Sequence, residues 1–298
     1  MRAEQLGVWQ SLDRLGYANA FAVAARAEAL GYDTFWYPES AISESMALGA
    51  ALLHRLKTMK VGSSIANIYA RDPMSAGNGV RTLNALSDGR FTLGLGVSHA
   101  PIVSGMRGHA YEKPLAAMRM YLEAIYACQH KLGQSTNLPI MLGALGPKML
   151  ALSGELAQGA LPYNVTPEHT EFARATLGPD RRLVVEQKVA LVKDASEGRR
   201  LARMELTRYM TLPNYRNNWL RLGFAEADLA GEGSDRFMDG MVAWGDADAI
   251  RARIQLHLDA GADQVAIQPI MDHALIAKGD MQPILAALAA LQPDEEAA

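Results

Sequence analysis

The sequence has few of the features that mark several well-known classes of protein. Its 298 residues include one cysteine, Cys128, so no internal disulfide can form and no oxidising compartment is needed. No run approaches the ~20 apolar residues of a membrane span, and residues 1–6 contain no apolar signal core. The 29 basic and 32 acidic side chains give a net charge of −3, without the basic excess that phosphate backbones or membrane surfaces attract. We therefore expect a soluble cytoplasmic protein that binds neither nucleic acid nor a membrane.

The chain is rich in alternating apolar segments. Hydrophobic residues make up 49% of it, and its length fits either two domains or one large barrel. A helical run over residues 18–30 ends at Gly31 and is followed by the β-rich run Thr34–Tyr37. Near the other end, a second helical run stops at Gly261 before the β-rich run Gln264–Ile267. This alternation is typical of parallel strands joined by crossover helices.

Counting the strands separates the two architectures. The predicted strands are Leu6–Trp9, Thr34–Tyr37, Lys60–Ile65, Phe91–Gly96, Ile140–Leu142, Ala160–Tyr163, Val184–Leu191 and Gln264–Ile267. Eight such units fit an α/β fold of the (β/α)8 TIM-barrel type, which needs about 250 residues. We expect one domain over residues 1–298, with the surplus in two loops: residues 98–112 after the fourth strand and residues 211–244 between the seventh and eighth. The rival, an open doubly wound sheet, normally has a glycine-rich turn after its first strand, and residues 10–13 contain no glycine.

Common hydrolase and metal motifs are also missing. The sequence has no G-x-S-x-G elbow, no P-loop and no H-E-x-x-H, and His99 and His109 have no obvious third metal ligand nearby, so no metal site is predicted. In a barrel, the active site is built from the residues that come directly after each strand. Those strand ends have small residues, amides and one imidazole rather than paired carboxylates, which favours a large planar cofactor over bond hydrolysis.

The fifth strand end is the most specific of these. Residues 143–148 (GALGPK) lead into a helix, so their backbone N–H groups and the helix N-terminus can bind a phosphate. A plain tight turn explains the same residues equally well. At the fourth strand end, Gly94 and Gly96 can either make room for a ring system or let bulky side chains pack, and His99 follows as a candidate acid or base.

Several segments carry a resemblance to a known family. Residues 88–99 (DGRFTLGLGVSH) look like the fourth-strand signature of the bacterial luciferase-like monooxygenase superfamily, and residues 61–73 (VGSSIANIYARDP) resemble its third strand. Residues 27–39, 143–147 and 259–263 also match, in the expected order. Within the superfamily, the chain looks most like the oxidoreductases that depend on the deazaflavin coenzyme F420, and residues 212–246 resemble a subgroup of uncharacterised members.

This resemblance implies specific roles for residues. A non-prolyl cis peptide between Ser64 and Ile65 would lie behind the cofactor ring, the turn after the fifth strand would take the cofactor phosphate, and His99 matches a catalytic acid. A second catalytic position, an Asp-His pair in a sugar-phosphate dehydrogenase of the family, matches Glu39-Ser40, where the imidazole is missing. The basic residues that bind the substrate phosphate there are not recognisable here, so we do not expect a sugar phosphate as substrate. The resemblance also implies a homodimer.

The site expected from the residues and the resemblance has three parts. The catalytic residues are His99 and Glu39. The cofactor-binding residues are Ser64, Ile65, Ala66, Asn67, Gly96, Ser98, Gly143, Ala144, Leu145, Gly146, Pro147 and Lys148. The candidate substrate residues are Trp9, Tyr69 and Tyr163, together with methionine or aromatic residues from the segment 211–244, which suggest a small apolar organic molecule. The acidic tail of F420 would need local basic residues, for which Arg71, Arg107 and Lys148 are candidates.

Four functions are compatible with these residues. The first is an F420-dependent oxidoreductase that transfers a hydride to or from a small substrate, because side chains do not transfer hydrides. The second keeps the fold and uses FMN, O2 and a partner reductase as a monooxygenase. The third is a protein that binds the cofactor without turnover, and the fourth is a Schiff-base barrel using Lys188 in the seventh strand.

Overall fold

The computed structural model describes residues 1–39 and 42–294. Its strands are β1 (Leu6–Trp9), β2 (Thr34–Tyr37), β3 (Lys60–Ser63), β4 (Ala66–Asn67), β5 (Phe91–Gly96), β6 (Ile140–Leu142), β7 (Gly159–Ala160), β8 (Arg182–Ala190), β9 (Val242–Trp244) and β10 (Gln264–Pro269). Its α-helices are α1 (Leu12–Leu15), α2 (Tyr17–Ala29), α3 (Ser45–Arg55), α4 (Pro73–Leu86), α5 (Pro114–Lys131), α6 (Pro147–Leu156), α7 (Pro167–Leu177), α8 (Ala195–Met210), α9 (Pro213–Arg221), α10 (Asp235–Met241), α11 (Ala247–Asp259), α12 (His273–Ala277) and α13 (Gln282–Ala290).

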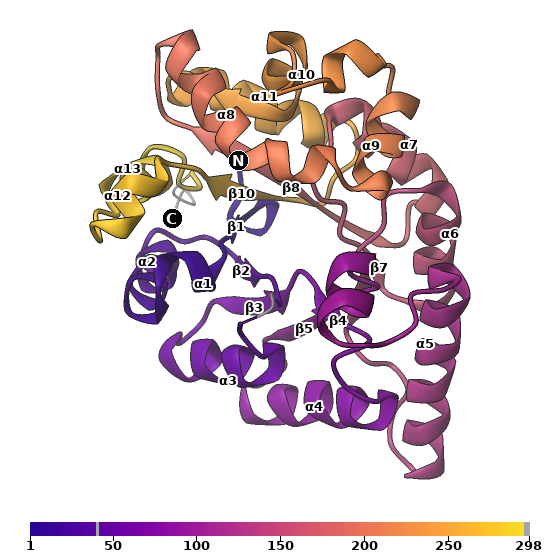
Figure 1. The fold of residues 1–298 in the computed structure, drawn as a ribbon. Coiled ribbons are helices and arrows are strands. Elements are labelled where there is room, and N and C mark those ends of the chain that lie inside the picture. Colours follow the sequence, from indigo (N-terminus) through magenta and orange to yellow (C-terminus); the bar gives the residue numbers. More distant parts are fainter. Residues whose placement is uncertain (40–41, 295–298) are drawn as a thin grey trace.

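The strands close into a parallel barrel, as the sequence predicts. Each strand pairs with the next in the order β1-β2-β3-β5-β6-β7-β8, and β10 closes the ring by pairing with both β8 and β1. The third barrel strand is broken into β3 and β4, which both pair with β5. Figure 1 shows the helices arranged around this ring, with α3 and α4 at one side and α8 to α11 at the other. No helix in the described part of the chain has both the length and the apolar character needed to cross a membrane.

Two apolar layers result from the alternation of side chains along the strands. Residues such as Leu6, Phe35 and Val185 face outward and pack against the helices, where they are buried. The side chains that face inward fill the barrel itself; Trp9, Trp36, Met141, Leu161, Val184 and Ala266 form this inner cluster. The barrel is therefore a packed core, and its ligand site has to lie at one rim.

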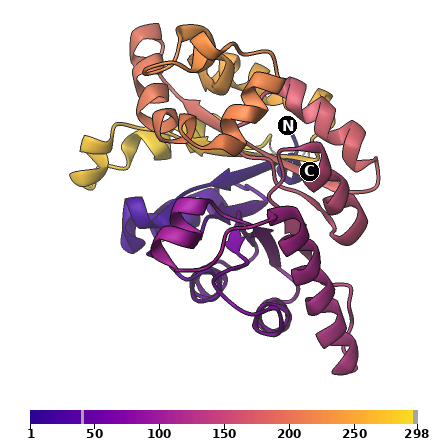
Figure 2. The same cartoon turned by 45° about the vertical axis from the view of Figure 1, so that its right-hand side comes forward.

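Two details of the predicted topology need correction. The segment of residues 98–112 contains a π-helical turn over Pro101–Met106 rather than only loop. The segment of residues 211–244 is mostly regular structure: it holds α9, a 3-10 turn over Glu226–Leu229, α10 and β9, which pairs with the end of β8. Its apolar residues, among them the fully buried Trp219 and Phe237, form one cluster with residues of α8 and the end of β8, so the segment packs against α8, with which it lies on one side of the molecule (Figure 2).

Candidate functional site

The carboxyl ends of the strands meet at one rim of the barrel, where they bring most of the predicted site residues together. The peptide bond between Ser64 and Ile65 is cis, which confirms the bulge expected between β3 and β4. The Ser64 N–H donates to the Tyr37 carbonyl at 2.6 Å, and the Ile65 carbonyl accepts the Glu39 N–H at 3.1 Å. The bulge is therefore held by the end of β2. The indole N–H of Trp9 donates to the Ser64 carbonyl at 3.3 Å from inside the barrel.

Ile65 explains the glycines on the neighbouring strands. A Cβ on Gly96 would lie 2.4 Å from the Ile65 side chain, and a Cβ on Gly143 would lie 3.0 Å from it. The Ile65 side chain therefore occupies the space that a larger side chain at either position would need. Gly96 is thus explained by the packing of a bulky side chain rather than by room for a ring system.

Glu39 is buried and fully engaged. Its side chain is 2% exposed and forms an ion pair with Arg71. Its carboxylate also accepts the backbone N–H groups of Asn67 at 2.6 Å and Ser45 at 3.2 Å. Arg71 in turn pairs with Glu44 at 2.6 Å. This arrangement favours a positioning role for Glu39, which ties β2 to the bulge, and it leaves Arg71 without a free charge for an acidic tail. Ser40, the other half of the expected catalytic pair, lies outside the described residues.

His99 lies at the rim after β5, where Ser98 adopts a positive φ of 56°. The Asn214 side chain hydrogen-bonds it, and its ring centroid is 5.7 Å from that of Tyr215. Burial lowers the pKa of His99, and its hydrogen bond to the Asn214 side chain, which favours the protonated ring, partly opposes this shift. A neutral imidazole at pH 7 can accept a proton. Asn214 and Tyr215 both belong to α9. Tyr215 is one of the aromatic residues of the segment 211–244 from which pocket residues are expected, whereas the sequence gives no sign of Asn214.

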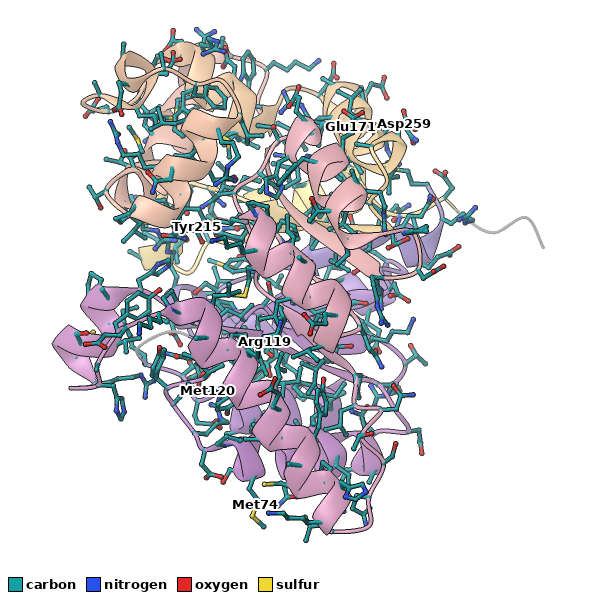
Figure 3. The ribbon with its side chains drawn as sticks, turned by 90° about the vertical axis from the view of Figure 1, so that its right-hand side faces the viewer. Met74, Arg119, Met120, Glu171, Tyr215 and Asp259 are labelled. Atoms are coloured by element: carbon teal, nitrogen blue, oxygen red, sulfur yellow. The ribbon has the colours of Figure 1, made fainter. Side chains whose placement is uncertain are left out.

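Aromatic rings connect His99 to the interior of the barrel. Tyr215 lies 6.3 Å from Tyr163, and Tyr163 lies 5.0 Å from Trp9, measured between ring centroids. Figure 3 shows Tyr215 at the edge of the α8–α10 group that faces the other half of the molecule. Two of the three predicted substrate residues, Trp9 and Tyr163, therefore meet. Tyr69 lies apart from them, with its ring 6.1 Å from that of Tyr111.

Lys188 and Glu186 form a buried ion pair next to Tyr163. The sequence indicates only Lys188 as a candidate for chemistry. Lys188 is 1% exposed and projects into the barrel, 4.0 Å from the Tyr163 ring centroid. Its ammonium group donates to the Asn164 side-chain oxygen and, at 3.2 Å, to Glu186. Burial lowers the pKa of Lys188, and the Glu186 carboxylate opposes that shift. The amine is enclosed by these partners rather than presented to a substrate, which argues against the Schiff-base hypothesis.

The turn after β6 has the features of an anion site. Gly146 is the N-cap of α6 and has no side chain to accept the N–H groups of the first turn, and Pro147 follows it. The carbonyl of Leu145 accepts a hydrogen bond from His169 at 2.9 Å, which fixes the turn from behind. Lys148 is exposed at its edge.

Arg221 from α9 also reaches this turn. Its guanidinium lies 4.0 Å from the point where a Cβ on Gly146 would be. It donates to the Asn218 side-chain oxygen at 3.0 Å, and no carboxylate in residues 1–39 and 42–294 is close enough to form an ion pair with it. An uncapped helix N-terminus beside an unpaired guanidinium is suited to phosphate. Sequence patterns do not reveal Arg221 as a site residue, because it lies in a segment expected to be loop.

Comparison with known proteins agrees with this geometry. The sequence profile of the family described as luciferase-like monooxygenase matches residues 4–264. A putative coenzyme F420-dependent oxidoreductase of Mycobacterium tuberculosis is 30% identical over 194 residues, which is 55% of this chain and 55% of that protein. The chain thus aligns with about half the length of this relative.

Solved structures share the fold. An F420-dependent secondary alcohol dehydrogenase in complex with an F420-acetone adduct superposes with a TM-score of 0.74 at 15% identity, covering 98% of this chain and 99% of that one. The oxygenating constituent of 3,6-diketocamphane monooxygenase from Pseudomonas putida, in complex with FMN, gives a TM-score of 0.69 at 14% identity and covers 97% of each chain. Together with the profile match, the barrel and its cis bulge lead to one conclusion: the chain belongs to the luciferase-like monooxygenase family.

Proposed function

We propose that the protein is an oxidoreductase that uses coenzyme F420 to exchange a hydride with a small organic substrate. The observation that carries this proposal is the grouping, at one rim of the barrel, of the cis bulge, His99 and the anion site at α6. These features support a site for a ring, a proton donor or acceptor and a phosphate. The similarity to a putative F420-dependent oxidoreductase supports F420 over the FMN alternative.

The residues present fit such a cofactor. Residues 64–67 would back its ring, and the turn of residues 143–148 would hold its phosphate together with Arg221. Lys148 and Arg107, which have no carboxylate partner in the described part of the chain, are the basic residues left for an acidic tail. When bound, the deazaflavin supplies the carbon atom that accepts or donates the hydride.

His99 is the group we assign to proton transfer. Its imidazole is neutral at pH 7, because burial lowers its pKa. It can therefore take the proton of a substrate hydroxyl group as the hydride leaves the carbon that carries this hydroxyl group. In the opposite direction, the resulting imidazolium returns the proton. Asn214 and Tyr215 hold the ring in position from α9. Glu39 contributes by fixing the bulge rather than by exchanging a proton.

The substrate we infer is small and largely apolar. Tyr215, Tyr163 and Trp9 present aromatic surface next to His99, and the hydroxyl of Tyr163 is already used in a hydrogen bond to Gln268 at 3.0 Å. The buried Glu186 carboxylate near these rings is paired with the Lys188 ammonium group at 3.2 Å.

Titration of the purified protein with F420 and with FMN, followed by fluorescence, tests the proposal. We expect F420 to bind and FMN to bind at least tenfold more weakly. Preferential binding of FMN would replace the proposal with a flavin monooxygenase, and binding of neither would exclude both. Tight F420 binding without reduction of the cofactor by any member of an alcohol panel would favour a binding protein without turnover.

A matched pair of variants tests the role of His99. His99→Ala should keep the F420 affinity and lose turnover, whereas His109→Ala, on the same segment, should keep both. Turnover at the wild-type rate in His99→Ala would remove His99 from the mechanism. Sedimentation velocity measures the homodimer that we also propose.

A further inference from the structure

The two ends of α9 contact two different parts of the proposed site. At its C-terminal end, Arg221 approaches Gly146 in the anion site. At its N-terminal end, Asn214 and Tyr215 contact His99. Seven residues of this nine-residue helix separate Asn214 from Arg221, so about 10 Å of rigid backbone joins the two contacts.

The Arg221 end of α9 has unused hydrogen-bonding capacity. Asn218 is fully buried, and its side-chain oxygen accepts from Arg221 at 3.0 Å. The amide nitrogen of the same side chain has no hydrogen-bond partner among the described residues. A buried donor without an acceptor costs free energy, and a ligand oxygen beside the guanidinium would satisfy it. Together with the uncapped α6 N-terminus, this second observation points to an oxyanion.

The middle of α9 is firmly attached to the barrel. The Trp219 indole N–H donates at 3.0 Å to the carbonyl of Asn164, which lies between β7 and α7. The Trp219 ring also stacks on that of Tyr215 at 5.8 Å and packs edge-on against Phe237 at 4.8 Å. A change at the Arg221 end is therefore passed to Tyr215 through packed rings rather than lost in a flexible segment.

We propose that α9 couples binding of a phosphate group at the α6 N-terminus to the placement of His99. Arg221 and Asn218 bind the phosphate oxygens, which fixes the helix, and the fixed helix holds Asn214 and Tyr215 against the imidazole. Arg221 is thus a binding residue for the phosphate and a positioning residue for His99. The source of the phosphate rests on the proposed function, in which it is the phosphodiester of F420. The coupling itself needs only a phosphate.

Three probes separate the coupling from the proposed function: inorganic phosphate, F420, and the deazaflavin fragment of F420 that lacks phosphate and tail. In the wild-type protein, inorganic phosphate should slow hydrogen exchange in residues 213–221 and shift the NMR signals of the His99 ring. Arg221→Gln should abolish both effects and weaken F420 binding about 10- to 100-fold, with no change for the fragment. Arg221→Lys should restore part of the F420 affinity.

Arg216→Gln is the matched control. Arg216 lies on the same helix but forms its ion pair with Glu226, so this variant should behave as the wild type with all three probes. If phosphate leaves the exchange of α9 and the His99 signals unchanged in the wild type, the coupling is wrong. It is also wrong if Arg221→Gln weakens the fragment and F420 equally. If phosphate acts on α9 as described but neither F420 nor the fragment binds, the coupling stands and the proposed function fails.

Discussion

Two buried histidines should make the protein sensitive to mild acid. His169 donates through Nε2 to the Leu145 carbonyl, since a carbonyl can only accept. His257 lies between Thr170, whose hydroxyl is 2.8 Å from Nδ1, and Gln187, whose side-chain oxygen is 3.0 Å from Nε2. Both are fully buried, and burial lowers the pKa of His169 to about 4 and that of His257 to about 3. Each ring is thus held in its neutral form in the folded protein.

Proton linkage gives the direction of the effect. In the unfolded chain a histidine titrates near 6.5, so below that pH the unfolded state binds protons that the folded state does not. Stability therefore falls as pH decreases from about 6.5 towards the folded-state pKa values of about 4 and about 3. Between pH 7 and pH 5, each histidine costs about 2 kcal/mol, or about 4 kcal/mol for the pair. That is a large fraction of the ~5–15 kcal/mol typical of folded proteins.

Urea unfolding at pH 7 and pH 5 measures this loss. His169→Gln and His257→Gln should each reduce the pH-dependent loss by about 2 kcal/mol, whatever they cost at pH 7. His54→Gln, at an exposed position on α3, should leave it unchanged. An equal loss in the wild type and in both buried variants would show that these histidines do not cause the acid sensitivity.

Three further substitutions test other parts of the site. Lys188→Met should lower the free energy of unfolding by about 3–5 kcal/mol, because it leaves Glu186 buried and unpaired, and the double variant Lys188→Met/Glu186→Gln should regain most of this in urea unfolding. Glu39→Gln should lower the melting temperature yet keep measurable turnover, whereas a folded variant without any turnover would make Glu39 catalytic. Gly96→Val should destabilise by about 1–3 kcal/mol through overpacking against Ile65, and Ile65→Ala in the same chain should relieve it; unchanged stability of Gly96→Val would contradict the contact.

The barrel strands are predictable from the sequence because each has a local signal. The predicted bounds of β1, β2, β5 and β6 agree with the structure. β7 is shorter than predicted: it ends at Ala160, and Pro162, which has no N–H, cannot continue the regular ladder through Tyr163. β9 is missed because three residues after a helix carry too little pattern to be seen.

The sequence does not show which residues that are far apart in the chain come into contact in the fold. Glu39 and Arg71 are each visible as charged residues near strand ends, but only the fold shows that they neutralise one another. Likewise, only the fold shows that Arg221 lies close to Gly146. The helix that carries Arg221 does have a local signal, because Tyr215 and Trp219 are four residues apart and form one apolar face, but the neighbouring proline and asparagines outweigh it.

The place of α9 has a consequence for how the site can vary. If one rigid helix contacts both His99 and the anion site, a substitution that moves it changes substrate positioning and cofactor affinity together. Residues on its barrel-facing side, such as Tyr215, are then poor positions at which to alter specificity alone. Trp9 and Tyr163 contact each other at the barrel side of this row of rings, so changes there should affect the substrate with less effect on the cofactor phosphate than changes in α9.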